Sequence, residues 1–362
     1  MPHALTIDKV EGKPGEVYYP LRLKEVPKPT PGPKEVLVRV NSVALNHRDH
    51  WIRKAQYAAI SFTAPLFSDA FGTVVSVGDG SSRSDLINKP VLLSPSHGWI
   101  SQPEGPEDPK KYAILGASQL SPVGMGQDYV VVPEDEVVLA PEHLTPAEGA
   151  ALPLAGVTAW RALVTKTGNA ERGRNILITG IGGGVALTAL QFAVGKGCNV
   201  YVTSGSQEKI EAAKNLGAVG GVSYKADKWD KELLALLPRD RPFIDAVVDS
   251  AGGDIIRRAT TFLKPGGVIA QYGMTTSPKM DWSMPAVLRN FELKGSTMGS
   301  RKEFLEMVDF VRTNKIKPVV SRVVKGLDNI EGIEGLFKDM AEGKQFGKLV
   351  LEVAPVGESS KL

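Results

Sequence analysis

The chain contains 362 residues, with 43 Lys plus Arg, 40 Asp plus Glu and one cysteine. At roughly 100–200 residues per domain this length predicts two domains, and the nearly balanced net charge of +3 gives no support to nucleic-acid binding. The single Cys198 excludes an intramolecular disulfide framework and a cysteine-rich zinc module.

Short strands separated by glycine and proline occupy the first part of the chain, residues 1–150. The predicted strands cover residues 35–40, 71–78, 89–93 and 129–133. Residues 35–40 alternate polar and apolar side chains, which is typical of a half-buried strand. This pattern predicts a small barrel or an irregular β domain.

Strands and helices alternate over residues 151–314. The predicted strands cover residues 175–179, 199–203, 244–250 and 267–272, and the predicted helices cover 185–196, 207–216 and 253–263. Such alternation predicts a doubly wound parallel sheet, so the expected fold class is α/β. Strand-like sequence returns at 315–354, which we expect to complete the first domain, and 355–362 form a tail. The uncharged run 175–195 contains several glycines and predicts a strand, turn and helix, not a membrane-inserted segment.

The strongest chemical signal is a glycine turn between an apolar strand and an uncharged helix. Glycine permits the tight turn and lets backbone N–H groups approach a pyrophosphate, which the helix N-terminus attracts through its partial positive charge. Within a βαβ series this pattern predicts a dinucleotide-phosphate site. Its residues are Gly180, Gly182, Gly183, Gly184 and Val185, with Val185 at the place of the third glycine.

The end of the next predicted strand indicates which dinucleotide binds. An NAD site has an acidic residue there for the ribose 2′-hydroxyl. Here the strand is followed by Ser204, Ser206 and Lys209, whose hydroxyls and positive charge suit a 2′-phosphate. The sequence therefore predicts NADPH as the cofactor in preference to NADH.

Besides the glycine turn, the segments that carry a family resemblance are Asn46–Asp49, Ala155–Trp160, Gly266–Val268, Tyr272–Gly273 and Gln345–Val350. Together they resemble the medium-chain dehydrogenase/reductase superfamily, over roughly residues 15–354. The most similar branch contains quinone oxidoreductases and enoyl reductases, near fungal zinc-type alcohol dehydrogenase-like proteins. The resemblance implies a GroES-like catalytic domain over 1–150, a Rossmann domain over 151–314, an active site in the cleft between them, and a homodimer.

Zinc alcohol dehydrogenases carry metal ligands at positions where this chain differs. By resemblance, Asn46 replaces a catalytic Cys, Ser68-Asp69 replace His-Glu, and Leu154 replaces a third ligand. Catalytic zinc needs three protein ligands, normally Cys, His or carboxylate. We therefore expect no zinc and no metal-binding residues. The expected reaction is hydride transfer to the C=C of an activated carbonyl, a quinone or an enoyl thioester, because hydrogen-bond donors can hold the resulting enolate without a Lewis acid.

The resemblance also implies roles for individual residues. The expected catalytic residues are Asn46, Asp49 and His47, with Asn46 donating to the nicotinamide carboxamide or the substrate oxygen and Asp49 orienting its loop. The proton source stays open between His47, His50, Tyr57, His97 and solvent. Further cofactor contacts are expected from Thr158, Tyr224, Ser250, Tyr272, Gly273 and Lys348.

The expected partner is a small molecule with a conjugated carbonyl. Two alternatives stay open: an alcohol or aldehyde dehydrogenase with an unrecognised metal or relay, and a non-catalytic NADPH-binding protein. The chain ends in Ser360-Lys361-Leu362, which matches the address read by the peroxisomal import receptor. This predicts a peroxisomal location, or a cytoplasmic one where the address is not used.

Overall fold

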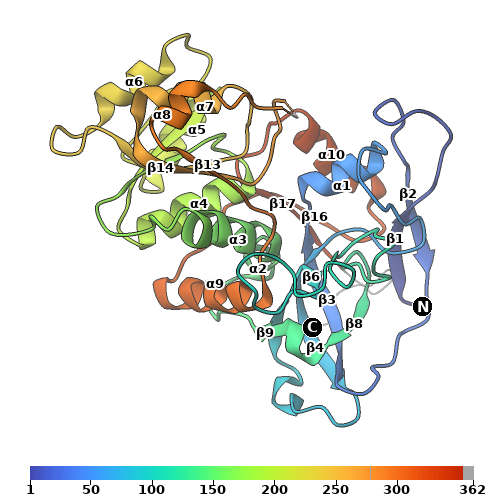
Figure 1. Ribbon diagram of the computed structural model, residues 1–362. Coiled ribbons are helices and arrows are strands. Elements are labelled where there is room, and N and C mark those ends of the chain that lie inside the picture. The colour runs from blue at the N-terminus through green and yellow to red at the C-terminus, as the bar shows by residue number, and fades with distance from the viewer. Residues whose placement is uncertain (278, 354–362) are drawn as a thin grey trace. The chain divides into compact units, whose positions relative to one another are not determined.

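The computed structural model describes residues 1–277 and 279–353 (Figure 1). Contacts divide the chain into two compact units. The β-rich unit comprises Met1–Leu154 and the chain from Ser300 onward, and the parallel-sheet unit comprises Ala155–Gly299. Within the described ranges, no helix combines the length and the apolar character needed to cross a bilayer. The predicted import address at 360–362 lies outside the described residues.

The β-rich unit is built around a seven-stranded sheet in which β16-β17-β3-β4-β5-β9 are neighbours and β8 pairs with β3. Its strands are β3 (Glu35–Ala44), β4 (Asp69–Val77), β5 (Pro90–Leu93), β8 (Tyr129–Pro133), β9 (Val137–Leu139), β16 (Val320–Lys325) and β17 (Lys348–Glu352). Neighbours are antiparallel except β16 and β17, which run parallel. Because β17 pairs with β3, strands from distant parts of the sequence share one sheet.

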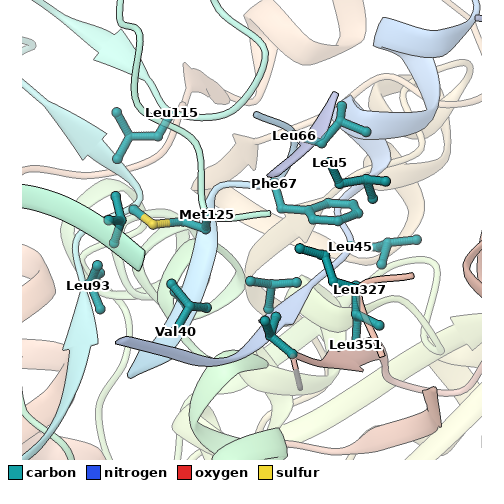
Figure 2. Packing of buried hydrophobic residues seen from close by; sticks show 14 of the residues in the cluster. Leu5, Val40, Leu45, Leu66, Phe67, Leu93, Leu115, Met125, Leu327 and Leu351 are labelled. Atoms are coloured by element: carbon teal, nitrogen blue, oxygen red, sulfur yellow. The ribbon is translucent and has the colours of Figure 1, made fainter. Parts of the chain in front are cut away.

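Apolar side chains from distant segments form the core of the β-rich unit (Figure 2). Leu5, Leu66 and Phe67 are completely buried, and they share this core with Leu327 and Leu351 from the C-terminal segment. Truncating one such side chain to alanine costs about 2–5 kcal/mol. The C-terminal segment is therefore an integral part of this unit.

Helix α1 (His47–Arg53) follows β3 directly and is anchored to helix α10 (Ile330–Ala341). Arg53, the last residue of α1, is buried and donates two hydrogen bonds to Glu334 of α10, at 2.9 and 2.6 Å. Its Nε donates to the carbonyl oxygen of Tyr19 at 2.8 Å. Arg53 is buried while Glu334 is partly exposed, so removing Glu334 would leave a buried guanidinium without its carboxylate, and these contacts hold the C-terminal end of α1 in place.

Helix α9 (Arg301–Asn314) belongs to the β-rich unit, whereas the sequence analysis placed residues up to 314 in the Rossmann domain. Its first backbone N–H groups, those of Arg301 and Lys302, donate to the carbonyl oxygens of Trp99 and Ile100 at 2.9 and 3.0 Å. Near its other end, Arg312 donates to the carbonyl oxygen of Leu139 at 2.9 Å. These long-range bonds correct the boundary to Ser300, and no local pattern in the sequence encodes them.

The loop that follows β6 (Ser96–His97) is organised by a carboxylate. Glu107 accepts hydrogen bonds from the backbone N–H groups of Ile100, Ser101 and Gln102, at 2.8, 2.6 and 3.0 Å. Because these bonds stabilise the ionised form, the pKa of Glu107 falls to about 2. The conformation of this exposed loop is thus held by an ionised carboxylate.

The parallel-sheet unit contains a six-stranded sheet with the order β12-β11-β10-β13-β14-β15, parallel throughout. The strands are β10 (Asn175–Ile178), β11 (Asn199–Ser204), β12 (Gly220–Ser223), β13 (Ile244–Asp249), β14 (Leu263–Gln271) and β15 (Glu292–Gly295). The helices are α4 (Gly184–Gly195), α5 (Gln207–Asn215), α6 (Trp229–Leu236), α7 (Ile255–Phe262) and α8 (Met284–Leu288).

Figure 1 shows α4 and α7 on opposite sides of β13 and β14, so the sheet has helices on both faces. The chain leaves β10 toward β11 and later returns to β13 on the other side of β10, which makes the carboxyl end of β10 the topological switch point. Together with the β-rich unit, this confirms the predicted α/β fold class.

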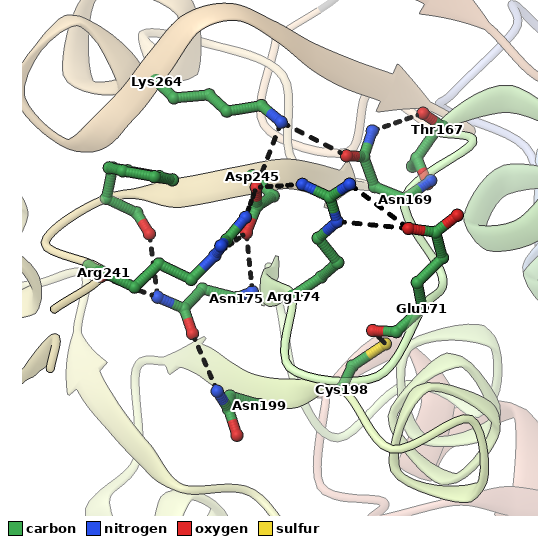
Figure 3. A network of polar contacts seen from close by, with 11 residues as sticks. Thr167, Asn169, Glu171, Arg174, Asn175, Cys198, Asn199, Arg241, Asp245 and Lys264 are labelled. Atoms are coloured by element: carbon green, nitrogen blue, oxygen red, sulfur yellow. Dashed lines mark hydrogen bonds and ion pairs between the residues drawn. The ribbon is translucent and has the colours of Figure 1, made fainter.

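The opposite, amino-terminal edge of this sheet is closed by a charged network around Asp245 (Figure 3). The buried carboxylate of Asp245 accepts from the backbone N–H of Asn175 at 2.9 Å and from the side chains of Arg241 at 2.7 Å and Lys264 at 3.0 Å. Burial opposes ionisation, but these bonds outweigh it and hold the pKa of Asp245 at about 2.

The single cysteine, Cys198, donates a hydrogen bond to the carbonyl oxygen of Glu171. Burial raises the pKa of its thiol to about 11, so this thiol is not a nucleophile.

Candidate functional site

The glycine turn lies between the end of β10 and the start of α4, at the switch point of the parallel sheet. Gly180 and Gly182 have φ angles of 64° and 127°, which only glycine adopts without strain. A Cβ at Gly182 would lie 2.9 Å from Cδ of Lys209, whereas a Cβ at Gly183 would meet nothing within 4 Å. The approach to the N-terminus of α4 is therefore open at Gly183. Gly184 and Val185 form the first turn of this helix, whose leading N–H groups suit a phosphate.

Asp249 organises the same edge of the sheet and was missed by the sequence analysis. Its buried carboxylate accepts from Thr179 Oγ1 at 2.5 Å, from the backbone N–H of Gly252 at 2.7 Å and from Gln271 Nε2 at 2.7 Å. These partners follow or end β10, β13 and β14, so one carboxylate ties three strand ends together. Burial raises the pKa of Asp249 although each bond favours its ionised form. The signal in the sequence is an acid that directly follows the apolar run 246–248 at the end of the strand.

The structure brings Ser250, Tyr272 and Gly273 together beside Asp249. The backbone N–H of Tyr272 donates to the carbonyl oxygen of Asp249 at 3.0 Å, and the Tyr272 hydroxyl is hydrogen-bonded to Ser250. Burial raises the pKa of this phenol, which therefore stays protonated. A Cβ at Gly273 would lie 3.4 Å from the carbonyl oxygen of Ser250, so the two strand ends are in contact.

The loop after β11 holds the residues predicted to bind the ribose phosphate. Ser206 caps α5 by accepting from the backbone N–H of Lys209 at 3.3 Å, while its hydroxyl donates to the carboxylate of Glu208 at 2.5 Å. Ser204 is buried and accepts from the backbone N–H of Ser206 at 3.3 Å. The aliphatic stem of Lys209 lies against Gly182, as the 2.9 Å approach above shows. This loop therefore joins the predicted phosphate turn to the end of β11.

Tyr224 lies against the same loop, and the residue after it, Lys225, adds a second cation that the sequence analysis missed. A Cβ at Gly205 would lie 2.6 Å from the hydroxyl oxygen of Tyr224 and 3.0 Å from Cε of Lys225. Both side chains are exposed. The signal for Lys225 was its position directly after the predicted Tyr224.

Thr158 lies in helix α3 (Pro153–Trp160) and is buried. Its hydroxyl contacts the sulfur of Met298 at 3.9 Å. Within the parallel-sheet unit this is a packing contact, and the expected contact with nicotinamide stays a prediction.

A buried polar cluster forms in the β-rich unit where β3, β4 and β17 meet. Lys348, the first residue of β17, donates from Nζ to Asn46 Oδ1 at 2.6 Å and to Asp69 Oδ2 at 2.9 Å. Asn46 Nδ2 donates to the same carboxylate oxygen at 2.8 Å. The other oxygen, Oδ1, accepts from the backbone N–H of Leu154 at 2.7 Å. We call Asn46, Asp69 and Lys348 the ammonium cluster.

Asp49 and Arg48 lie beside the ammonium cluster in the first turn of α1. Asp49 is completely buried and accepts from the backbone N–H of Asn46 at 2.7 Å, while Arg48 donates to the Ser68 hydroxyl at 3.0 Å and to the carbonyl oxygen of Leu115 at 2.6 Å. Burial raises the pKa of Asp49 to about 6, against the opposing effect of Arg48. Asp49 therefore caps the start of α1, and its expected part in catalysis stays a prediction.

His47 differs from the other two predicted catalytic residues because its side chain is exposed, whereas Asn46 and Asp49 are buried. Although the residue is exposed overall, burial of its ring lowers the pKa of His47, and the nearby Lys348 and His50 lower it further. The ring is therefore neutral at pH 7 and carries one N–H donor.

The residues at the positions of zinc ligands do not fit a zinc ion. Asn46 and Asp69 already bind the Lys348 ammonium, Ser68 bonds to Arg48, and Leu154 offers only its backbone N–H, which Asp69 accepts. Over residues 1–277 and 279–353, no three His, Cys, Asp or Glu side chains gather as a metal site would need.

The family profiles described as "Alcohol dehydrogenase GroES-like domain" and "Zinc-binding dehydrogenase" match residues 32–142 and 184–313. A zinc-type alcohol dehydrogenase-like protein of Leptosphaeria maculans, YogA, is 55% identical, covering 98% of this chain and 100% of that protein.

Two further similarities bear on the activity. The crystal structure of an NAD-dependent alcohol dehydrogenase has a TM-score of 0.82 at 31% identity, covering 97% of this chain and 100% of that one. An acryloyl-coenzyme A reductase of Sulfurisphaera tokodaii is 25% identical, covering 91% of this chain and 96% of that protein.

Proposed function

The chain belongs to the medium-chain dehydrogenase/reductase superfamily, and on that premise we propose that this oxidoreductase is NADPH-dependent and works without zinc. It reduces the C=C of a small molecule with a conjugated carbonyl, a quinone or an enoyl thioester. The observation that carries the proposal is the ammonium cluster, because Lys348 binds the two polar side chains that stand at ligand positions of zinc relatives. We also propose that the protein forms a homodimer.

The choice of acceptor follows from the donor set. A saturated carbonyl or an alcohol needs strong polarisation of its oxygen, which a Lewis acid normally supplies. An activated C=C needs less polarisation of its carbonyl oxygen. When hydride adds to the β-carbon, the negative charge is delocalised onto this oxygen, and hydrogen-bond donors are enough to stabilise it there. The name of the acryloyl-coenzyme A reductase relative supports this acceptor class.

The cofactor requirement rests on the residues of the parallel-sheet unit. The open N-terminus of α4 suits the pyrophosphate, and the loop of Ser204 and Ser206, with the cations Lys209 and Lys225, suits a 2′-phosphate. When bound, NADPH supplies the hydride. Ser250, Tyr272 and Gly273 are proposed to contact its nicotinamide half.

His47 is the proposed source of the proton. It alone among the three predicted catalytic residues has an exposed side chain, and its lowered pKa keeps the ring neutral with one N–H donor. That N–H holds the carbonyl oxygen of the acceptor as negative charge develops there. As the ring gives this proton to the oxygen, its second nitrogen takes a proton from solvent, so the imidazole stays neutral. Asn46, whose amide is bonded on both sides within the ammonium cluster, positions the backbone from which His47 extends.

An alcohol dehydrogenase is the second candidate, favoured by the name of the structurally similar NAD-dependent enzyme. The deciding experiment follows oxidation of NADPH and NADH by chelator-treated protein with a short enone, a quinone, an enoyl-CoA and the matching saturated aldehyde. Turnover of the unsaturated acceptors with NADPH supports the proposal. Turnover of the aldehyde alone, abolished by the chelator, overturns it. Binding of NADPH without turnover of any acceptor favours the non-catalytic alternative.

A further inference from the structure

Lys348 is a buried cation whose three N–H donors are all used inside the β-rich unit. Its Nζ donates to the carbonyl oxygen of Leu45 at 2.8 Å, to Asn46 Oδ1 at 2.6 Å and to Asp69 Oδ2 at 2.9 Å. An ammonium group has three donors and no acceptor, so these oxygens satisfy it completely. They form an oxygen-lined cation site that the protein fills with its own side chain.

This arrangement decides which way the amide of Asn46 points. The ammonium can only donate, so it requires Oδ1, and the ionised Asp69 can only accept, so it requires Nδ2, which lies 2.8 Å away. A flipped amide would place a donor against the ammonium and an acceptor against the carboxylate. Lys348 and Asp69 thus select one orientation of Asn46.

The orientation of Asn46 is transmitted to the start of helix α1. Asn46 is the residue that precedes this helix, and its backbone N–H is bonded to Asp49 at 2.7 Å. The next residue is His47, the proposed proton source. We propose that Lys348 is a positioning residue whose ammonium acts as the resident cation of this site, and that it is not a ligand of the cofactor phosphates. The inference rests on the proposed function for its catalytic consequence only.

The proposal departs from the role that the family resemblance implied for Lys348, which was a direct contact with the cofactor. The geometry favours the internal role, because a lysine that bound a phosphate would have to give up hydrogen bonds to a buried carboxylate and a buried amide. Leaving Asp69 buried without its cation is strongly unfavourable.

The test uses Lys348→Ala in the full chain, because the truncated side chain removes the ammonium donor from all three oxygens and leaves the Asp69 carboxylate with the Asn46 amide but no cation. Methylammonium chloride supplies the missing group, and tetramethylammonium chloride supplies the same charge with no N–H donor. We expect methylammonium to raise the thermal unfolding midpoint of the variant saturably, tetramethylammonium to have no such effect, and the wild-type protein to respond to neither. Lys325→Ala is the matched control, because Lys325 pairs with Glu352 of β17 on the exposed side of the unit.

Cofactor binding and turnover separate the two roles. Titration with NADPH, followed by fluorescence, should give the same affinity for Lys348→Ala and wild type, while kcat falls about a hundredfold through misplacement of the catalytic residues. Methylammonium should restore part of kcat. A loss of NADPH affinity with kcat preserved at saturation overturns the proposal, and so does a folded variant that ignores methylammonium.

A second variant keeps the proposal falsifiable if Lys348→Ala does not fold. Lys348→Met combined with Asp69→Asn removes both charges at nearly constant volume, so no buried charge is left unpaired. It should bind NADPH as the wild type does and show a raised pKa of His47 by NMR titration, because the nearby Lys348 charge lowers that pKa. Loss of NADPH binding overturns the proposal. If the wild type reduces none of the acceptors, the proposed function fails. The thermal unfolding midpoints and the NADPH affinities still decide the role of Lys348, so the two proposals can fail independently.

Discussion

Thr179 donates a hydrogen bond of 2.5 Å to the buried carboxylate of Asp249, and this bond ties the end of β10 to the end of β13. The glycine turn begins one residue later, so the bond fixes the place from which the turn departs. Hydrogen bonds to charged groups contribute about 1.5–3 kcal/mol each.

Thr179→Val keeps the shape of the side chain and removes this bond. We expect the free energy of unfolding in urea to fall by about 1.5–3 kcal/mol and the affinity for NADPH to fall with it. Thr260→Val is the control, because its hydroxyl donates only to the carbonyl oxygen of Arg257 at 2.7 Å. If Thr179→Val is destabilised but binds NADPH with unchanged affinity, the hydrogen bond between Thr179 and Asp249 does not contribute to cofactor binding.

Two glycines of the turn should respond differently to alanine. Gly182→Ala places a Cβ 2.9 Å from Lys209 at a φ of 127°, so it should cost about 1–3 kcal/mol of stability as well as NADPH binding. Gly183→Ala meets nothing within 4 Å, so the fold should tolerate it, while the added methyl occupies the open approach to α4. Thermal unfolding and NADPH titration of both variants check this. Normal NADPH binding by Gly183→Ala would mean that the phosphate lies elsewhere.

The loop after β11 should set the choice between NADPH and NADH. Lys225→Ala should raise KM for NADPH about tenfold, which corresponds to about 1.4 kcal/mol, and leave KM for NADH unchanged. Glu208→Gln should lower KM for NADPH, because Glu208 now binds the Ser206 hydroxyl and places a negative charge beside it. Lys231→Ala on α6 is the control. Equal effects on both cofactors would place the 2′-phosphate away from this loop.

Asp49 should make stability depend on pH between about 4 and 6. Its pKa rises from 3.8 to about 6 on folding, so its stabilising contribution is complete below the lower value and is lost as the pH rises through the upper one. A shift of about two pKa units corresponds to roughly 3 kcal/mol. Compared with Asp49→Asn, the wild type should therefore lose about that much stability between pH 4 and pH 8, measured by urea unfolding. A pH-independent difference would contradict the burial of an ionisable carboxyl there.

The C-terminal tripeptide is tested in cells. A fluorescent protein fused to the N-terminus should accumulate in peroxisomes, and deletion of Leu362 should leave it in the cytoplasm. Identical distribution of the two fusions would exclude use of this import address.

Much of the parallel-sheet unit could be predicted because its signals are local. A strand, a glycine turn and a helix are each recognisable within about ten residues, since hydrophobic periodicity and the positive φ of Gly180 and Gly182 involve only near neighbours. The same reasoning found the loop of Ser206 and Lys209. It missed Lys225, which follows β12 and lies against this loop because β12 pairs with β11.

The sequence by itself determined the α/β class and the position of the glycine turn, and it placed Asn46, Ser68-Asp69 and Leu154 where, by resemblance, zinc relatives carry ligands. Only the tertiary structure decided that Lys348 meets Asn46 and Asp69, which are 302 and 279 residues away, and that helix α9 belongs to the β-rich unit. The physical reason is that a local pattern encodes how a segment folds and which face it buries. Which buried cation finds which carboxylate depends on how distant strands pair in the completed sheet.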